Sequence, residues 1–172
     1  MNNTPKHTIS LFVANKPGVL NRIALVFSRR GYNIDSLVVS PSKNDNFSQM
    51  NIVASGDERT LDQILKQLNK LVDVVHADDY SGDTIISKEM AIIKVSIDTE
   101  TRMEILQVAQ AFECETVDFT DTTISFLITG ETIKLDSAEN IFENFGILEI
   151  MRTGQVIMAR GNRLTATPKK HY

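Results

Sequence analysis

The residues best suited to do chemistry lie between Asn15 and Leu20, where Asn-Lys-Pro-Gly-Val-Leu follows a predicted strand and opens a predicted helix. The start of a helix leaves backbone N–H groups without partners and carries partial positive charge. Because Gly18 has no side chain to block a ligand, a small carboxylate could bind the N–H groups of Gly18, Val19 and Leu20. Asn15 could offer its amide oxygen to an ammonium group. Together these groups would bind the backbone of a free amino acid; alternatively, Asn15 only caps the helix and Gly18 only permits close packing.

Residue types that could support catalysis are scattered elsewhere in the sequence. Cys114 is the only cysteine, and no neighbouring residue supplies the base or the positive charge that would activate its thiol, which indicates a buried or inert group. His76 is followed by Asp78 and Asp79, a weak candidate metal site that is more typical of a solvated strand end. The motifs of serine hydrolases, zinc proteases, phosphate-binding loops and dinucleotide-binding folds are missing from the sequence. We therefore expect no catalytic residue, no metal site and no cofactor bound by this chain.

Composition excludes several classes of function. The 172 residues include 18 Lys and Arg against 22 Asp and Glu, and the net charge of -4 argues against a general nucleic-acid binder. The basic pairs at 29–30 and 169–170 fit a helix end and a solvated tail better than a nucleic-acid site. No apolar run approaches the ~20 residues that span a bilayer, and residues 1–8 lack the apolar core of a secretory signal. We therefore expect a cytoplasmic location, with the plastid stroma as the alternative.

Hydrophobic periodicity predicts two similar halves, each with the order β-α-β-β-α-β. Apolar residues alternate over 8–13 as in a strand and recur at helical spacing over 20–27. Asp57 can cap the second helix, and Thr101 with Glu104 fits a capping box at the third. The predicted strands are 8–13, 34–39, 50–54, 72–80, 91–97, 116–119, 124–128, 147–152 and 155–159, and the predicted helices are 20–27, 61–68, 105–112 and 135–145.

This order predicts an α+β fold of two ferredoxin-like βαββαβ units, in which both helices of a unit pack on one face of an antiparallel sheet. The second strand of such a unit lies at a sheet edge, where its outer N–H and C=O groups have no partner. Turn residues at 81–83 mark the boundary between the units. We therefore expect domains at 1–80 and 81–164 and a polar tail at 165–172.

Two segments of the first half resemble the regulatory small subunits of acetolactate synthase, an enzyme also called acetohydroxyacid synthase (AHAS). They are Asn-Lys-Pro-Gly-Val-Leu-Asn-Arg-Ile at 15–23 and Phe-Ser-Arg-Arg-Gly-Tyr-Asn-Ile-Asp-Ser-Leu at 27–37. The run Arg-Arg-Gly-Tyr-Asn-Ile is the most specific part. Shorter stretches of the same kind are found at 56–58, 66–74, 152–154 and 160–161, so that the resemblance extends from about Thr8 to Gly161.

The resemblance implies that residues 1–80 form an ACT domain, a ferredoxin-like module that senses amino acids. It implies a non-catalytic subunit that activates the large catalytic subunit and makes it sensitive to feedback inhibition by valine or a related branched-chain amino acid. Thiamine diphosphate, magnesium and FAD are expected in that catalytic partner.

In such families the effector binds between two ACT domains, which implies a homodimer. Carried over by position, the carboxylate-binding loop of one chain would be Asn15, Gly18, Val19 and Leu20. Asn33 and Ile34, at the start of the second strand, would face the effector from the neighbouring chain.

One segment departs from the family pattern. Gln49 and Asn51 stand where the family more often has Arg and Thr, and exposed strand residues of this kind could contact the large subunit. A stand-alone amino-acid sensor with a different partner is therefore the main alternative, and a small enzyme is the weakest. Capture of a large thiamine-diphosphate enzyme would separate the first two hypotheses, and turnover by the isolated chain would favour the third.

Overall fold

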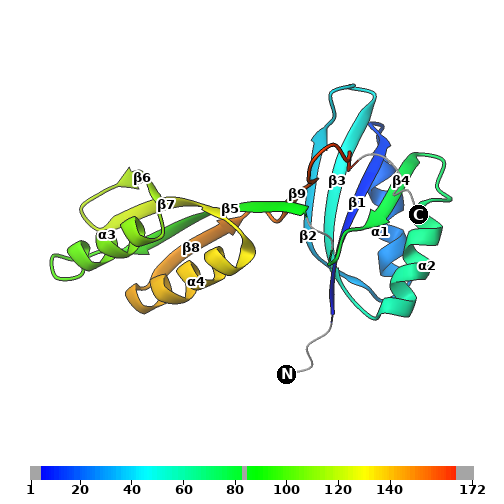
Figure 1. Cartoon of the computed structure of the whole chain (residues 1–172). Helices are drawn as coiled ribbons and strands as arrows, with labels where there is room; N and C mark the ends of the chain where they lie inside the picture. Colours follow the sequence, from blue (N-terminus) through cyan, green and yellow to red (C-terminus); the bar gives the residue numbers. More distant parts are fainter. Residues whose placement is uncertain (1–4, 83–84, 166–172) are drawn as a thin grey trace. The chain divides into compact units, whose positions relative to one another are not determined.

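The computed structural model describes residues 5–82 and 85–165 and shows two compact units, each built from one antiparallel sheet and two helices (Figure 1). The first unit contains the chain up to Ser87 together with the segment from Gln155, and the second contains Lys88–Gly154.

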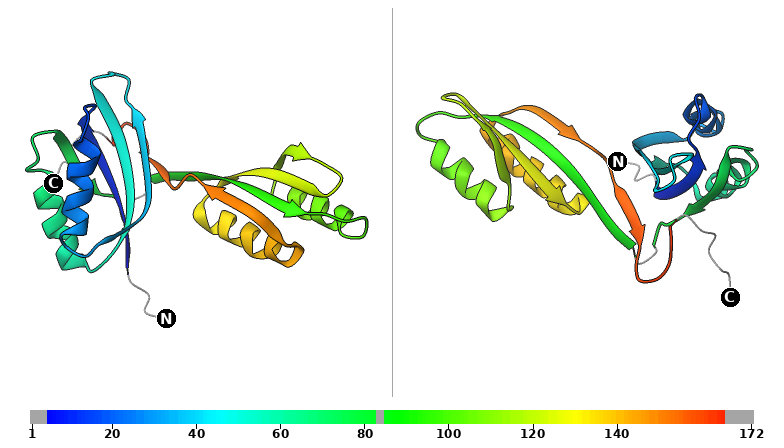
Figure 2. Two further views of the ribbon diagram at one scale, coloured as in Figure 1. Left: turned by 180° about the vertical axis from the view of Figure 1, so that it is seen from behind. Right: turned by 90° about the horizontal axis from the view of Figure 1, so that it is seen from above.

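The first unit has the strand order β2-β3-β1-β4. Figure 2 shows that α1 and α2 lie on the same face of this sheet. Alternate residues of β1, such as Ile9 and Leu11, and helix residues such as Ile23 and Phe27 are fully buried between the two layers. β2 lies at the sheet edge, as predicted. The elements are β1 (Lys6–Ala14), α1 (Val19–Ser28), β2 (Asn33–Pro41), β3 (Phe47–Ser55), α2 (Glu58–Leu68) and β4 (Val74–Asp79).

The second unit repeats this plan with the strand order β6-β7-β5-β8. Its core places Ile93 of the central strand against Phe126 and Phe142, whose rings stack with centroids 5.4 Å apart. The elements are β5 (Ile85–Ser96), α3 (Arg102–Ala111), β6 (Glu115–Phe119), β7 (Thr123–Gly130), α4 (Thr132–Phe142), a 3-10 turn (Glu143–Phe145) and β8 (Ile147–Arg152); β9 (Val156–Ala159) also pairs with β5. The predicted fold of two ferredoxin-like units is therefore confirmed.

The limits of the compact units differ from the predicted domain boundaries. The chain returns to the first unit after Gln155, where the Tyr80 hydroxyl donates a hydrogen bond to the carbonyl oxygen of Thr165 at 3.2 Å. The guanidinium of Arg163 lies 5.2 Å from the centre of the same, fully buried ring. Thr165 therefore contacts the first unit, and the rest of the predicted tail, with the basic pair at 169–170, lies outside the described residues.

The two predicted helix caps have different outcomes. Asp57 caps α2 as expected and accepts a hydrogen bond from the Thr60 N–H at 2.9 Å, and the hydrogen bonds from Thr60 lower the pKa of Asp57. The capping box at Thr101 is wrong, since its side chain makes no capping hydrogen bond. Instead the Asp98 carboxylate accepts hydrogen bonds from the N–H groups of Glu100 and Thr101 at 2.9 and 2.7 Å. An aspartate three residues earlier satisfies these donors before the helix begins.

Candidate functional site

The turn at Gly18 requires glycine for conformational reasons. Gly18 precedes α1 with φ +81° and ψ -6°, in the left-handed region that side chains disfavour. The nearest atom to a Cβ built at this position would be Nη1 of Arg22, at an ordinary contact distance of 3.5 Å. The interpretation that Gly18 only permits close packing is therefore wrong; the backbone conformation selects glycine.

Asn15 holds the loop in place but does not cap α1. Its Nδ2 group donates a hydrogen bond to the carbonyl oxygen of Asp45 at 2.9 Å, and its backbone N–H donates to the carbonyl oxygen of Asn46 at 2.8 Å. Both acceptors belong to the turn between β2 and β3. Within the described residues the amide oxygen of Asn15 accepts no hydrogen bond, and the residue is exposed. The side chain is therefore oriented by its nitrogen and keeps its oxygen available to a ligand.

One of the three predicted N–H donors is engaged within the chain. The Val19 N–H donates to the carbonyl oxygen of Lys16 at 3.4 Å, and the Val19 side chain is buried in the core. The N–H groups of Gly18, Leu20 and Asn21 donate no hydrogen bond in the part of the chain that the structure describes. The open donors at the start of α1 are therefore Gly18, Leu20 and Asn21, whereas Val19 anchors the helix.

An ion pair beside this loop was not predicted. Nη2 of Arg22 lies 2.6 Å from Oδ2 of Asp73, and the Asp73 carbonyl oxygen accepts a hydrogen bond from the Ala14 N–H at 2.7 Å. The pair joins the first turn of α1 to the segment before β4. Arg22 stands four residues after Gly18, a helical spacing that places it above the loop, but its partner is 51 residues away in sequence. The ion pair holds the guanidinium beside the loop, with Nη1 3.5 Å from the position of a Cβ built at Gly18.

Asn33 and Ile34 lie at the opposite end of the same sheet. Asn33, which opens β2, pairs with Ser55 at the end of β3, whereas Phe47 at the start of β3 pairs with Ala14, just before the loop. Nine residues of β1 separate the two ends, a distance of about 25 Å at about 3.3 Å per residue. One chain therefore cannot bring all six predicted residues together. They could form one site only with a neighbouring chain, as the resemblance implied.

The polar residues on β3 are less exposed than predicted. Asn51 is only 5% exposed, and its Oδ1 accepts a hydrogen bond from the Ser10 hydroxyl at 3.1 Å. Nε2 of Gln49 donates to the same hydroxyl at 2.7 Å. The expectation that Asn51 is an exposed contact residue is therefore wrong. The hydrogen bonds among Ser10, Gln49 and Asn51 satisfy the polar groups of these side chains, so that the side chains can be buried.

The two other candidates are Cys114 and His76 with the aspartates that follow it. Nε2 of His76 lies 3.8 Å from Oδ2 of Asp78, and no cluster of three metal-ligating side chains exists among residues 5–82 and 85–165. Burial raises the pKa of the Cys114 thiol, although the charge of Lys134 lowers it. This direction fits the expected inert cysteine. No helix in the described ranges is long and apolar enough to cross a membrane.

Both units match known protein families. Residues 9–76 match the AHAS small subunit-like ACT domain, and residues 88–161 match the family described as the small subunit of acetolactate synthase.

Individual relatives agree with these families over nearly the whole chain. The acetolactate synthase small subunit of Mycolicibacterium smegmatis is 41% identical over 162 residues, which cover 94% of this chain and 95% of the relative. The chloroplastic small subunit 2 of Arabidopsis thaliana is 37% identical over 96% of this chain, which spans 35% of that longer protein. The crystal structure of the small subunit from Thermotoga maritima aligns with a TM-score of 0.83 at 37% identity, over 92% of this chain and 99% of that chain. The chain therefore belongs to the family of acetolactate synthase small subunits, the regulatory, non-catalytic partners of that enzyme.

Proposed function

We propose that this chain activates the large catalytic subunit of acetolactate synthase and makes it sensitive to feedback inhibition by valine or a related branched-chain amino acid. Thiamine diphosphate, magnesium and FAD are assigned to the catalytic partner. The bacterial cytoplasm is the proposed location, with the plastid stroma as the alternative.

The observation that carries this proposal is the start of α1. The open N–H groups of Gly18, Leu20 and Asn21 suit a carboxylate, and the available amide oxygen of Asn15 suits an ammonium group. The Leu20 side chain is 46% exposed and offers apolar contact. A free amino acid with an aliphatic side chain matches these three features. Discrimination among valine, leucine and isoleucine would rest on about 1–3 kcal/mol per methylene.

The sheet edge supports a site shared by two chains. If two β2 strands pair antiparallel about a two-fold axis, the start of one strand lies beside the end of the other. Pro41, at the end of β2, pairs with Ser48 at the same end of the sheet as the effector loop. The pairing would therefore bring Asn33 and Ile34 of the second chain toward the loop of the first. A ligand bound there would act on the large subunit only through different affinity for two arrangements of the dimer.

Asn33→Ala tests whether the effector site spans two chains. We expect roughly tenfold weaker binding of L-valine, the cost of one lost hydrogen bond to a charged group. The fold should be unchanged because Asn33 is exposed and its amide bonds only the neighbouring Asp35, at 2.6 Å. Calorimetric titration of the purified chain measures this, with Asn140→Ala on the exposed side of α4 as the matched control.

Mixed dimers make the same test decisive. Chains with Gly18→Asp and chains with Asn33→Ala are each expected to bind valine poorly alone. In a mixed dimer, one site would combine the intact loop of the second chain with the intact Asn33 of the first. Recovered valine binding on mixing supports the shared site, and no recovery, with both single variants impaired, would mean that each site is formed within one chain.

A further inference from the structure

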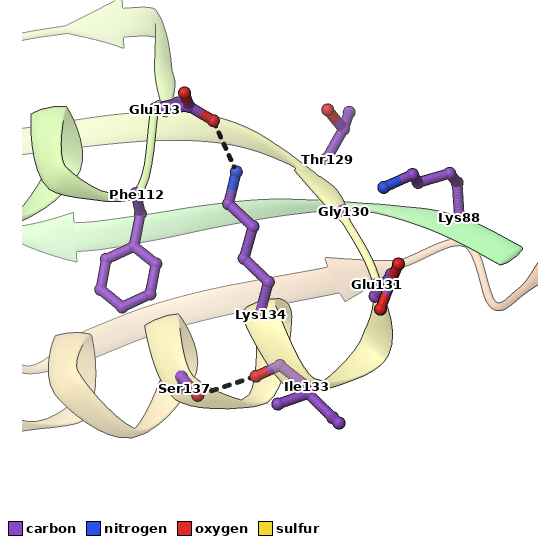
Figure 3. Close-up of a pocket in the computed structure, with 9 residues that line it drawn as sticks. All are labelled: Lys88, Phe112, Glu113, Thr129, Gly130, Glu131, Ile133, Lys134 and Ser137. Carbon is purple, nitrogen blue, oxygen red and sulfur yellow. Dashed lines mark hydrogen bonds and ion pairs between the residues drawn. The ribbon is translucent and has the colours of Figure 1, made fainter.

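The second unit contains a cavity of about 630 Å³ between the end of α3, the end of β7 and the start of α4 (Figure 3). Gly130 forms part of its wall, and the Phe112 ring and Ile133 provide apolar surface. Ile133 is 77% exposed, which is unusual for a large aliphatic side chain at the border of a cavity. Neither the family resemblance nor the effector loop of the first unit accounts for this cavity.

Comparison of the two units shows how the wall of the cavity differs from the equivalent part of the first unit. Gly31 after α1 and Glu113 after α3 both have left-handed backbone, with φ +68° and +56°. The following residues, Tyr32 and Cys114, both donate their N–H to the carbonyl oxygen five residues earlier, at 3.2 and 2.8 Å. Tyr32 and Cys114 therefore occupy equivalent positions in the two units.

The residues that face these positions are equivalent as well. Asp57 before α2 and Glu131 before α4 have nearly the same backbone, with φ and ψ of -78° and 150° against -79° and 155°. Each follows a glycine. In the first unit the Tyr32 ring packs so closely against Gly56 that a Cβ there would clash with it, and the Tyr32 hydroxyl donates to the Asp57 carbonyl oxygen. In the second unit the stem of Lys134 takes the place of this ring, since its Cδ would lie 2.7 Å from a Cβ built at Gly130.

The charges around the cavity are balanced but not fully paired. Nζ of Lys134 lies 3.2 Å from the Glu113 carboxylate, so these two groups neutralise each other. Lys88 and Glu131 also face the cavity and form no ion pair within the described residues. Figure 3 shows them at one end of the cavity, near Gly130, with Phe112 at the other end. One positive and one negative group thus share a space that has an apolar wall.

We propose that this cavity is a second ligand site, and that it binds a free α-amino acid with an apolar side chain. The ligand's carboxylate binds near Lys88, its ammonium group near Glu131, and its side chain lies against Phe112 and Ile133. A simple anion would meet the uncompensated charge of Glu131, and a simple cation would meet that of Lys88. A zwitterion satisfies both. The site is separate from the start of α1 and does not depend on the function proposed above.

An NMR titration of the ¹⁵N-labelled full-length chain with L-leucine tests this proposal. We expect saturable shifts of the Gly130, Glu131 and Ile133 amides, recorded separately from any shifts at 15–22 in the first unit. Lys88→Ala and Glu131→Gln should each weaken this binding roughly tenfold. Glu131 makes no capping hydrogen bond with its side chain, so its substitution should preserve α4. Lys43→Ala, at an exposed turn of the first unit, should leave the binding unchanged.

Two further experiments test the shape and charge of the site. Ile133→Ala removes one apolar wall of the cavity and should weaken the shifts of the second unit. If that variant does not fold, the variants at Lys88 and Glu131 still decide the question. 4-Methylpentanoate, which is leucine without its amino group, should bind at least tenfold more weakly, and equal binding would overturn the assignment to a zwitterion. Leucine-dependent shifts confined to the first unit, or no shifts at all, would overturn the second site.

Discussion

Replacement of Gly18 by aspartate should abolish inhibition by valine and leave activation of the catalytic subunit close to that of the unmodified chain. The introduced carboxylate would lie beside Arg22, where the effector's own carboxylate is proposed to bind. Like-charge repulsion and the loss of the N–H contacts together should raise the valine concentration for half-inhibition by about 100-fold or more. Inhibition curves of the reconstituted enzyme measure this change.

Gly18→Asn is the matched control for this substitution. Asparagine and aspartate both tolerate the left-handed backbone that φ +81° imposes, so the two variants carry similar strain. Only aspartate adds a negative charge. We therefore expect Gly18→Asn to keep a substantial part of the valine sensitivity. Full sensitivity in Gly18→Asp would exclude the start of α1 as the carboxylate site.

The largest expected effect on stability follows from removal of Arg152. Its guanidinium, at the end of β8, contacts the carboxylate of Glu89 on β5, and it lies 2.6 Å from Asp136 and 3.1 Å from Glu139 on α4. The Glu89 side chain is only 5% exposed. Arg152→Ala would leave this carboxylate buried without a counter-charge. We expect a loss of about 3–5 kcal/mol in the unfolding free energy of the second unit, measured by urea denaturation.

Two comparisons separate this charge effect from lost packing. Arg152→Lys keeps the positive charge but loses the planar fork of donors, so its loss should be intermediate. Replacement of both partners, Arg152→Met with Glu89→Leu, should restore much of the stability because no buried charge remains.

Burial alone would lower the pKa of Arg152, but the hydrogen bonds and charges of Glu89 and Asp136 raise it overall. The raised pKa means that the arginine's contribution to stability is fully present below its ordinary pKa and is lost only above the raised value. An Arg152→Ala loss below about 1 kcal/mol would show that Glu89 finds water or another partner.

The order of the elements could be predicted because burial on one side imposes different periods on strands and helices. The alternation of apolar residues over 8–13 predicted β1, and their helical spacing over 20–27 predicted α1. The edge position of β2 followed from the βαββαβ order alone. The predicted strand at 155–159 was also correct, but its return to the first unit was not foreseen. That return is held by contacts such as Tyr80 with Thr165, which are 85 residues apart and leave no local pattern.

The details of the candidate site depend on backbone geometry that residue types do not specify. The Val19 N–H donates a hydrogen bond to the Lys16 carbonyl oxygen because the chain turns there through the left-handed Gly18. The burial of Asn51 could not be read from its polar side chain, because it depends on hydrogen bonds that arise only when β1 and β3 pair. Neither half of the sequence contains a pattern that predicts the cavity of the second unit. The equivalence of Tyr32 and Cys114 becomes visible only when the folds of the two units are compared.

The most direct test of the account is the rate of acetolactate formation by the cognate large subunit, measured with and without this chain across a titration of L-valine. The account predicts that the chain raises the rate and that valine reverses the increase. Activation that is insensitive to valine would contradict the assigned effector and its site at the start of α1. No change in rate on addition of the chain would contradict the proposed regulation of that large subunit.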